Sequence, residues 1–130
     1  SAGTYNFSTN LVSGEVMAAN STNATPATAY TFAVDEQPIA MAVSVTGRGT
    51  AATTNGTCDV FFQRSVDGTN FEAATPLLKV SLAAPGATNG TAVEWYNLYG
   101  VKAVRVGRRE NSCFGAVSNL NVTAAMKVEK

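Results

Sequence analysis

The chain has 130 residues, enough for one domain that buries a core without needing a disulfide or a metal ion. Nine basic and nine acidic residues give a net charge of zero, and charged residues are only 14% of the chain. No long-range field therefore draws it to nucleic acid or to an anionic membrane, and so weakly charged a surface suits a crowded assembly. No apolar run nears the about 20 residues of a membrane-spanning helix, so no membrane is expected as a partner.

The N-terminal part is predicted to form an edge strand followed by an extended segment. Tyr5 and Phe7 alternate with polar residues, which indicates a short strand. Residues 12–27 are small, polar and aperiodic, which predicts a long surface loop or an arm on a neighbouring subunit. We therefore divide the chain into residues 1–28, an edge strand with its arm, and residues 29–130, a β-sandwich domain.

Short alternating segments fill the rest of the chain. The clearest covers residues 39–46, where large β-branched or apolar side chains alternate with small ones. Further strands are predicted at residues 29–35, 58–65, 77–83, 91–98, 101–109 and 120–128. Eight or nine short strands separated by Gly, Pro and Asn turns predict an all-β antiparallel sandwich, either Ig-like or a jelly roll.

The segment from Cys58 to Phe71 is predicted to be a mostly buried strand that ends in a tight turn. Val60 and Phe62 share one face of this strand. The turn is expected at Asp67-Gly68, because glycine adopts a positive φ without steric cost. A calcium loop would need further oxygen ligands at fixed spacing, which this segment lacks.

Catalytic and metal-binding patterns are missing from the sequence. It has no histidine, which removes the commonest general base and most zinc sites. Its acidic residues are scattered, and no Cys-x-x-Cys motif occurs. We expect a protein that is not an enzyme and has no catalytic, metal-binding or cofactor-binding residues.

Two cysteines, Cys58 and Cys113, allow one intrachain pair. Cys58 opens one predicted strand and Cys113 follows another, so the two could lie side by side. The sequence leaves open whether they form a disulfide or remain two small buried thiols.

One basic cluster stands out. Its members are Arg64, Lys102, Arg105, Arg108 and Arg109. With the nearby aromatic residues it matches, in outline, a groove for single-stranded nucleic acid. We instead expect salt bridges or contacts between subunits, because Asp59, Glu94 and Glu110 are placed to balance the charge, and nucleic acid is not expected as a partner.

Residues 61–71 read Phe-Phe-Gln-Arg-Ser-Val-Asp-Gly-Thr-Asn-Phe, an apolar strand followed by Gln-x-Ser-x-Asp-Gly-x-Asn and an aromatic residue. This pattern resembles a hairpin of small β-sandwich proteins in tailed-phage virions, and residues 95–106 are similar to the strand that pairs with it there. The resemblance implies a capsid decoration (cement) protein or a head accessory protein. Its partner would be the major capsid protein or other copies of itself in a symmetric assembly. Its location would be the capsid surface of a virion assembled in the host cytoplasm.

The sequence thus predicts a structural virion protein that binds and stabilises the outer surface of a viral shell. Edge strands and the arm would supply the contacts, with Tyr5, Phe7, Val16 and Met17 as candidate interface residues. One alternative is a carbohydrate-binding or adhesin module that stacks sugars on Trp95, Tyr96 or Tyr99, which requires those rings to lie on an open face. Another is a self-assembling coat or extracellular filament subunit.

Overall fold

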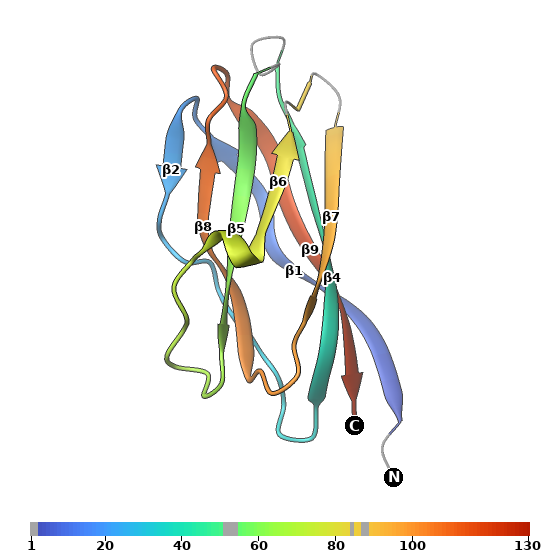
Figure 1. The fold of residues 1–130 in the computed structure, drawn as a ribbon. Helices are drawn as coiled ribbons and strands as arrows, with labels where there is room; N and C mark the ends of the chain where they lie inside the picture. Colours follow the sequence, from blue (N-terminus) through green and yellow to red (C-terminus); the bar gives the residue numbers. More distant parts are fainter. Residues whose placement is uncertain (1–2, 51–54, 84, 87–88) are drawn as a thin grey trace.

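The structure, a computed structural model, describes residues 3–50, 55–83, 85–86 and 89–130, and most of these residues lie in strands (Figure 1). The strands are β1 (Thr4–Met17), β2 (Ser21–Asn23), β3 (Tyr30–Thr31), β4 (Gln37–Arg48), β5 (Thr57–Ser65), β6 (Lys79–Ala83), β7 (Asn89–Asn97), β8 (Ala103–Asn111) and β9 (Val117–Glu129). A 3-10 turn, η2 (Pro76–Leu78), precedes β6. Within the described ranges no helix is long and apolar enough to cross a membrane.

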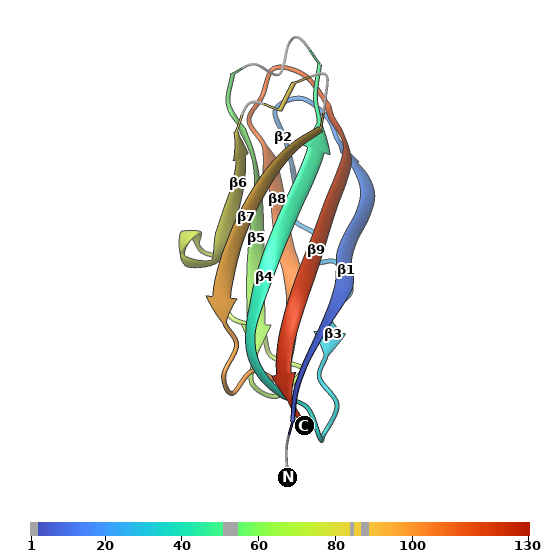
Figure 2. The ribbon, with the colours of Figure 1, turned by 90° about the vertical axis from the view of Figure 1, so that its right-hand side faces the viewer.

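Two antiparallel sheets stack face to face (Figures 1 and 2). Sheet A has the strand order β1-β9-β4-β7, and sheet B has the order β2-β8-β5-β6, with the two-residue β3 also pairing with β8. If the short β3 is left aside, each strand lies in the other sheet from the strand before it, except β6, which follows β5 in sheet B. This order is that of a jelly roll. The predicted antiparallel sandwich is confirmed, and of its two expected forms the jelly roll is the one observed.

Alternating side chains from both sheets form the core. In β4, Met41, Val43 and Val45 are buried and face Val60 and Phe62 of β5 across the sandwich. Their neighbours in sequence point away, because successive side chains of a strand lie on opposite faces. The C-terminal strand β9 follows the same rule, with its buried members listed here: Val117, Leu120, Val122, Ala124, Met126 and Val128.

Residues 12–27 do not form an arm, which corrects the expected division at residue 28. Strand β1 continues to Met17 and pairs with β9 along its length, with irregular register around Gly14, whose φ is +63°. After it, β2 pairs with β8, and the Ala27 N–H donates to the Val106 carbonyl. The N-terminal segment is therefore an integral edge of both sheets.

The predicted turn at Asp67-Gly68 is present, and Gly68 has a φ of +83°. It does not close a two-residue hairpin. The chain returns only far enough for the Glu72 N–H to donate to the Arg64 carbonyl. The next strand of the chain that pairs with β5 is β6, which begins only at Lys79. The segment 66–75 is thus a long loop at one end of the sandwich.

Candidate interaction surface

The four predicted interface residues do not share one surface. Tyr5 and Val16 are exposed, and Phe7 is half-buried with its ring centroid 5.5 Å from that of Tyr30. Met17 is 2% exposed, in the core. Met17 therefore cannot contact a partner, because the irregular register of β1 between Val12 and Met17 turns its side chain inward.

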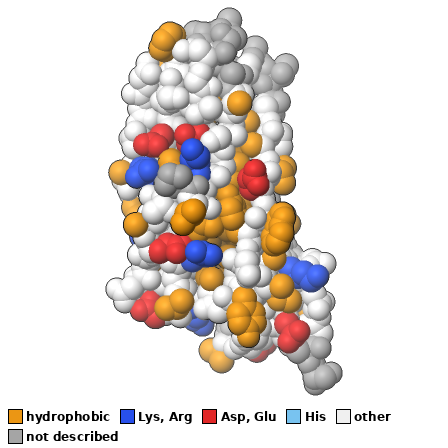
Figure 3. Space-filling model, viewed as in Figure 1, with side chains coloured by type: hydrophobic (Ala, Val, Ile, Leu, Met, Phe, Trp, Pro, Cys, Tyr) orange, Lys and Arg blue, Asp and Glu red, His pale blue; other side chains and the backbone are white. Residues whose placement is uncertain are grey.

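The basic cluster is dispersed into separate contacts. Figure 3 views the outer face of sheet B, where basic and acidic groups lie next to one another. Arg64 pairs with Glu72 at 2.8 Å, and Lys102 donates to the Phe32 carbonyl. Two further guanidinium groups stack on rings, Arg105 on Phe71 at 3.9 Å and Arg108 on Phe61 at 4.2 Å. A continuous basic groove is therefore not formed by these residues.

Arg109 is the member of the cluster that lies inside the sandwich. Its Nε and Nη2 donate to the two carboxylate oxygens of Glu15 at 2.8 and 3.1 Å, and its Nη1 donates to the Thr25 carbonyl. Both side chains of this pair are largely buried. The prediction of which acids balance the cluster is thus partly wrong. Arg109 pairs with Glu15, and Arg64 pairs with Glu72. Of the three acidic residues expected to balance the charge, all of which the structure describes, only Glu110 forms an ion pair with the cluster, with its Oε1 3.6 Å from Nε of Arg108.

Cys58 and Cys113 are both buried as free thiols. Burial raises the pKa of the Cys58 thiol to about 12, and the neighbouring Cys113 adds to the shift. Burial also raises the pKa of Cys113. Few thiolates therefore form at neutral pH, which makes both cysteines slow to react.

Three loops at one end of the sandwich present apolar side chains to solvent. Among the described residues, four large apolar side chains are more than four-fifths exposed, and three of them lie here: Val34 at 91%, Val66 at 81% and Tyr99 at 84%. The fourth, Leu77, lies on η2. We call Val34, Val66, Tyr99 and the adjacent Val101 the apolar end.

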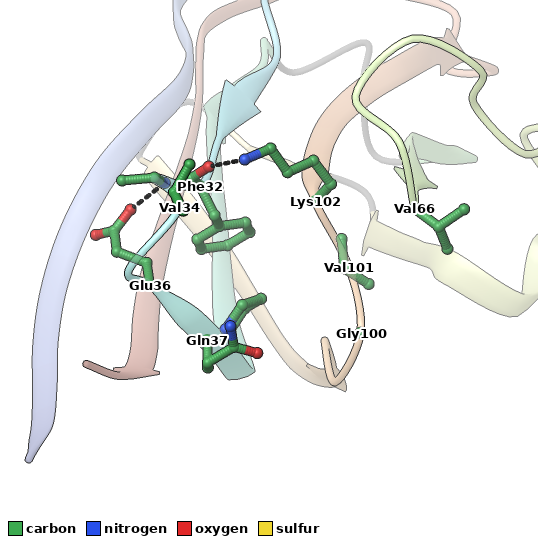
Figure 4. A pocket seen from close by; sticks show the side chains of 10 residues that line it. Phe32, Val34, Glu36, Gln37, Val66, Gly100, Val101 and Lys102 are labelled. Atoms are coloured by element: carbon green, nitrogen blue, oxygen red, sulfur yellow. Dashed lines mark hydrogen bonds between the residues drawn. The ribbon is translucent and has the colours of Figure 1, made fainter. Parts of the chain in front are cut away.

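Two shallow depressions join these residues into one surface. The first, of about 190 Å³, lies between Val34, Val66 and Val101 (Figure 4). The second, of about 320 Å³, lies between Val66, Tyr99 and Val101 and is bordered by the Arg64–Glu72 pair. An apolar centre with a polar border is the usual composition of a protein-binding patch. This surface could not be predicted from the sequence, because its members come from three loops far apart in the chain.

The aromatic residues near Trp95 divide between surface and core. Trp95 is 71% exposed on the outer face of sheet A, and Tyr99 stands at the apolar end. Tyr96 turns inward, where its ring packs near Phe62 and its hydroxyl donates to the Lys79 carbonyl. The open-face requirement of a sugar platform is thus met by Trp95 and Tyr99, on different surfaces.

A metal centre does not emerge from the described residues, among which no three His, Cys, Asp or Glu side chains are grouped to hold an ion. The acidic pair Asp59 and Glu110 lies side by side on β5 and β8, next to a polar depression. One oxygen of Asp59 is buried without a hydrogen-bond partner. Two carboxylates alone do not define a metal site.

No known protein family matches the chain, and no curated protein matches it either. Among solved structures, it is similar to a subunit from a study of Bacillus endospore appendages described as disulfide-linked pili, with 10% identity, a TM-score of 0.35, and coverage of 97% of this chain and 86% of that one. It is also similar to a chain of Cocksfoot mottle virus (7% identity, TM-score 0.43, coverage 98% and 83%). A third similarity is to the C-terminal CBM6 of LamC, a laminarinase from Zobellia galactanivorans (12% identity, TM-score 0.37, coverage 93% and 98%).

Proposed function

We propose that the chain is a structural accessory protein that docks on the outer surface of a viral shell through its apolar end. The observation behind this proposal is that Val34, Val66 and Tyr99, each more than four-fifths exposed, gather on loops at one end of the sandwich. Exposed apolar patches with a polar rim are typical of protein-binding sites.

Docking would stabilise the shell by burying these side chains. Fully burying a valine or a larger apolar side chain contributes about 1.5–3 kcal/mol. Three such side chains would therefore offset a large part of the cost of association, which is about 4–15 kcal/mol. The depressions on either side of Val66 would receive side chains of the shell subunit. Because only the assembled shell offers the site, binding favours the assembled form by mass action.

The arrangement of the loops suits this role. The 33–36 and 98–102 loops are held by hydrogen bonds: the Ala33 N–H donates to Glu36, and the Lys102 ammonium donates to the Phe32 carbonyl (Figure 4). The third loop is held by the carboxylate of Asp67. Loops fixed before binding lose little conformational entropy on docking.

The test is co-sedimentation with shells assembled from the major capsid protein encoded in the same genome. The double variant Val66→Asp/Tyr99→Asp places two charges at the apolar end, and we expect it to weaken saturable binding by about a hundredfold or more. The matched control is Phe114→Asp. Phe114 is also exposed, at 71%, but lies in the β8–β9 connection at the opposite end of the sandwich (Figure 1).

Both variants change exposed side chains, so their thermal unfolding is expected to match that of the unmodified chain. Failure of the unmodified chain to bind shells would contradict the proposal. Undiminished binding by the double variant, or equal loss in the Phe114→Asp control, would also contradict it.

A further inference from the structure

The outer face of sheet A is open and has a regular composition. Figure 2 looks onto it, with β7, β4, β9 and β1 side by side and nothing in front of them. The pairing register places its side chains in rows that run across the four strands. From β1 to β7, the two central rows are Ser8, Ala125, Ala42, Trp95 and Asn10, Thr123, Ser44, Val93.

These central rows are uncharged, and their side chains are small except at one edge. Only Trp95 and Val93, both on the edge strand β7, rise above the rest, at 71% and 61% exposed. The alanines beside Trp95, Ala42 and Ala125, are exposed. We call the two raised side chains, Trp95 and Val93, the ridge. We call the small side chains of β1, β9 and β4 in the same two rows the floor.

Some of the polar side chains on this face already have partners within the chain. The Thr123 hydroxyl donates to Asn10 Oδ1 at 3.1 Å, and in the next row Asn121 Oδ1 accepts from the Gly14 N–H at 2.8 Å. Burying a polar group costs little when it is already hydrogen-bonded. The Thr123 hydroxyl and the Asn121 side-chain oxygen can therefore lose water without being left unsatisfied.

We infer that this face binds the same face of a second copy of the chain. A two-fold axis parallel to the strands, through the middle of the row Ser8–Ala125–Ala42–Trp95, places the ridge of each copy on the floor of the other. Trp95 of one copy then covers Ser8 and Ala125 of the second, and the contact occurs twice, as an isologous interface requires. Val93 repeats the same contact one row along, over Asn10 and Thr123.

Size and charge both fit a second copy. Four strands about 4.8 Å apart and about ten residues long make a face of roughly 19 by 33 Å, so the pair would bury about 1,200 Å², the lower limit for a specific interface. Identical faces repel when they are charged, but here the central rows have no charge. Lys127 and Glu129 lie at one end of the face, outside these central rows.

A sugar fits the same place less well. A sugar ring stacked on Trp95 would extend its hydroxyl groups over Ala42 and Ala125, which offer no side-chain hydrogen bond. Apolar side chains of another protein surface would instead bury those methyl groups, and burying apolar surface stabilises the contact. The inference is independent of shell docking, which uses the loops at the end of the sandwich rather than this face.

The test is sedimentation velocity of the full chain over a broad range of concentrations. We expect a monomer–dimer equilibrium. Trp95→Ala should raise the dissociation constant of the dimer by about thirtyfold, because it removes the largest side chain buried in the contact. Ala125→Glu should abolish the dimer, because each copy would bury one unpaired charge in the contact. The control is Phe114→Ala, because Phe114 has the same exposure as Trp95, 71%, and lies outside this face.

Each outcome decides for or against the inference. A chain that stays monomeric at every concentration overturns it, as does a dimer that survives Ala125→Glu or is equally weakened by Phe114→Ala. Saturable binding of laminarin or cello-oligosaccharides that is lost in Trp95→Ala would assign this face to sugar instead. The Val66→Asp/Tyr99→Asp variant should dimerise normally, so failure of shell docking leaves this result unaffected.

Discussion

At the scale of single residues, the Arg109–Glu15 pair joins segments that are far apart in the sequence. Arg109 lies on β8 of sheet B and Glu15 on β1 of sheet A, and the Thr25 carbonyl accepts a third hydrogen bond from the same guanidinium. The pair therefore closes the side of the sandwich where β1 and β2 form the edges. A charge buried here needs its partner, because an unpaired ion in the interior is costly.

We predict that Arg109→Met destabilises the chain by about 3 kcal/mol, because it leaves the Glu15 carboxylate buried and unpaired. Urea unfolding at neutral pH measures this change. The double variant Glu15→Leu/Arg109→Met should recover most of the loss. The control is Arg64→Met, which breaks a pair that is about one-third exposed and should cost less than about 1 kcal/mol. Equal losses for Arg64→Met and Arg109→Met would contradict this account.

Asp67 holds the loop that contains Val66. Its carboxylate accepts hydrogen bonds from the Asn70 backbone and side-chain N–H groups, from the Thr69 N–H and from the Ser65 hydroxyl. These bonds favour the ionised form and hold the pKa of Asp67 well below its usual range. The folded state therefore binds a proton at this site less readily than the unfolded chain does.

The sign of the pH effect follows from that lowered pKa. The stabilisation from Asp67 is fully present above the unfolded pKa of about 3.9 and is lost progressively as the pH falls below it. We predict that Asp67→Ala lowers the urea midpoint near neutral pH, and that the gap between the variant and the unmodified chain narrows below about pH 4. A gap that stays constant with pH would show that the ionised carboxylate is not the stabilising group.

At the scale of elements, β1 belongs to the sandwich although its composition resembles a loop. It buries Leu11, Val12 and Met17 and pairs with β9. At its end, the buried Asn111 side chain donates to the carbonyls of Met17 and Ala18 and anchors the turn to β2.

We predict that a chain without residues 1–17 does not fold. The deletion removes an edge strand, exposes the core beneath it and leaves Arg109 without its carboxylate. Circular dichroism and a thermal scan measure the result, and the matched control is removal of residues 1–3 only, before β1 begins. If the chain without residues 1–17 unfolded cooperatively at the same midpoint temperature as the full chain, the N-terminal segment would be an appendage and not part of the fold.

Regular alternation in the sequence predicted the strands well wherever no extra residue interrupts it. The buried faces of residues 41–45 and 120–128 follow directly from their period of two. In β8 the register shifts opposite Phe61 and Phe62, which leaves Gly107 as an extra residue. This bulge reverses the alternation, so that Arg108 points outward and Arg109 inward, and a bulge of this kind leaves little trace in one sequence. The burial of Met17 was missed for a different reason: residues 12–27 show no regular alternation, so the sequence did not predict that β1 continues to Met17.

At the scale of the whole molecule, the two proposed surfaces are compatible. The apolar end comprises loops between strands, whereas the face of sheet A runs along the strands (Figures 1 and 2). A dimer joined through sheet A would present two apolar ends, and two linked sites bind a repeating lattice more tightly than one. The apolar end could not be predicted from sequence, because Val34, Val66 and Tyr99 meet only through the jelly-roll topology.

Docking of the apolar end on a shell is tested most directly by a cryo-EM reconstruction of shells mixed with the chain. We expect density for one sandwich at each symmetry-equivalent position, with loops 33–36, 66–75 and 98–102 against the shell and Val66 and Tyr99 buried in the contact. Bare shells would contradict the account. So would a sandwich attached through the opposite end, where Phe114 lies.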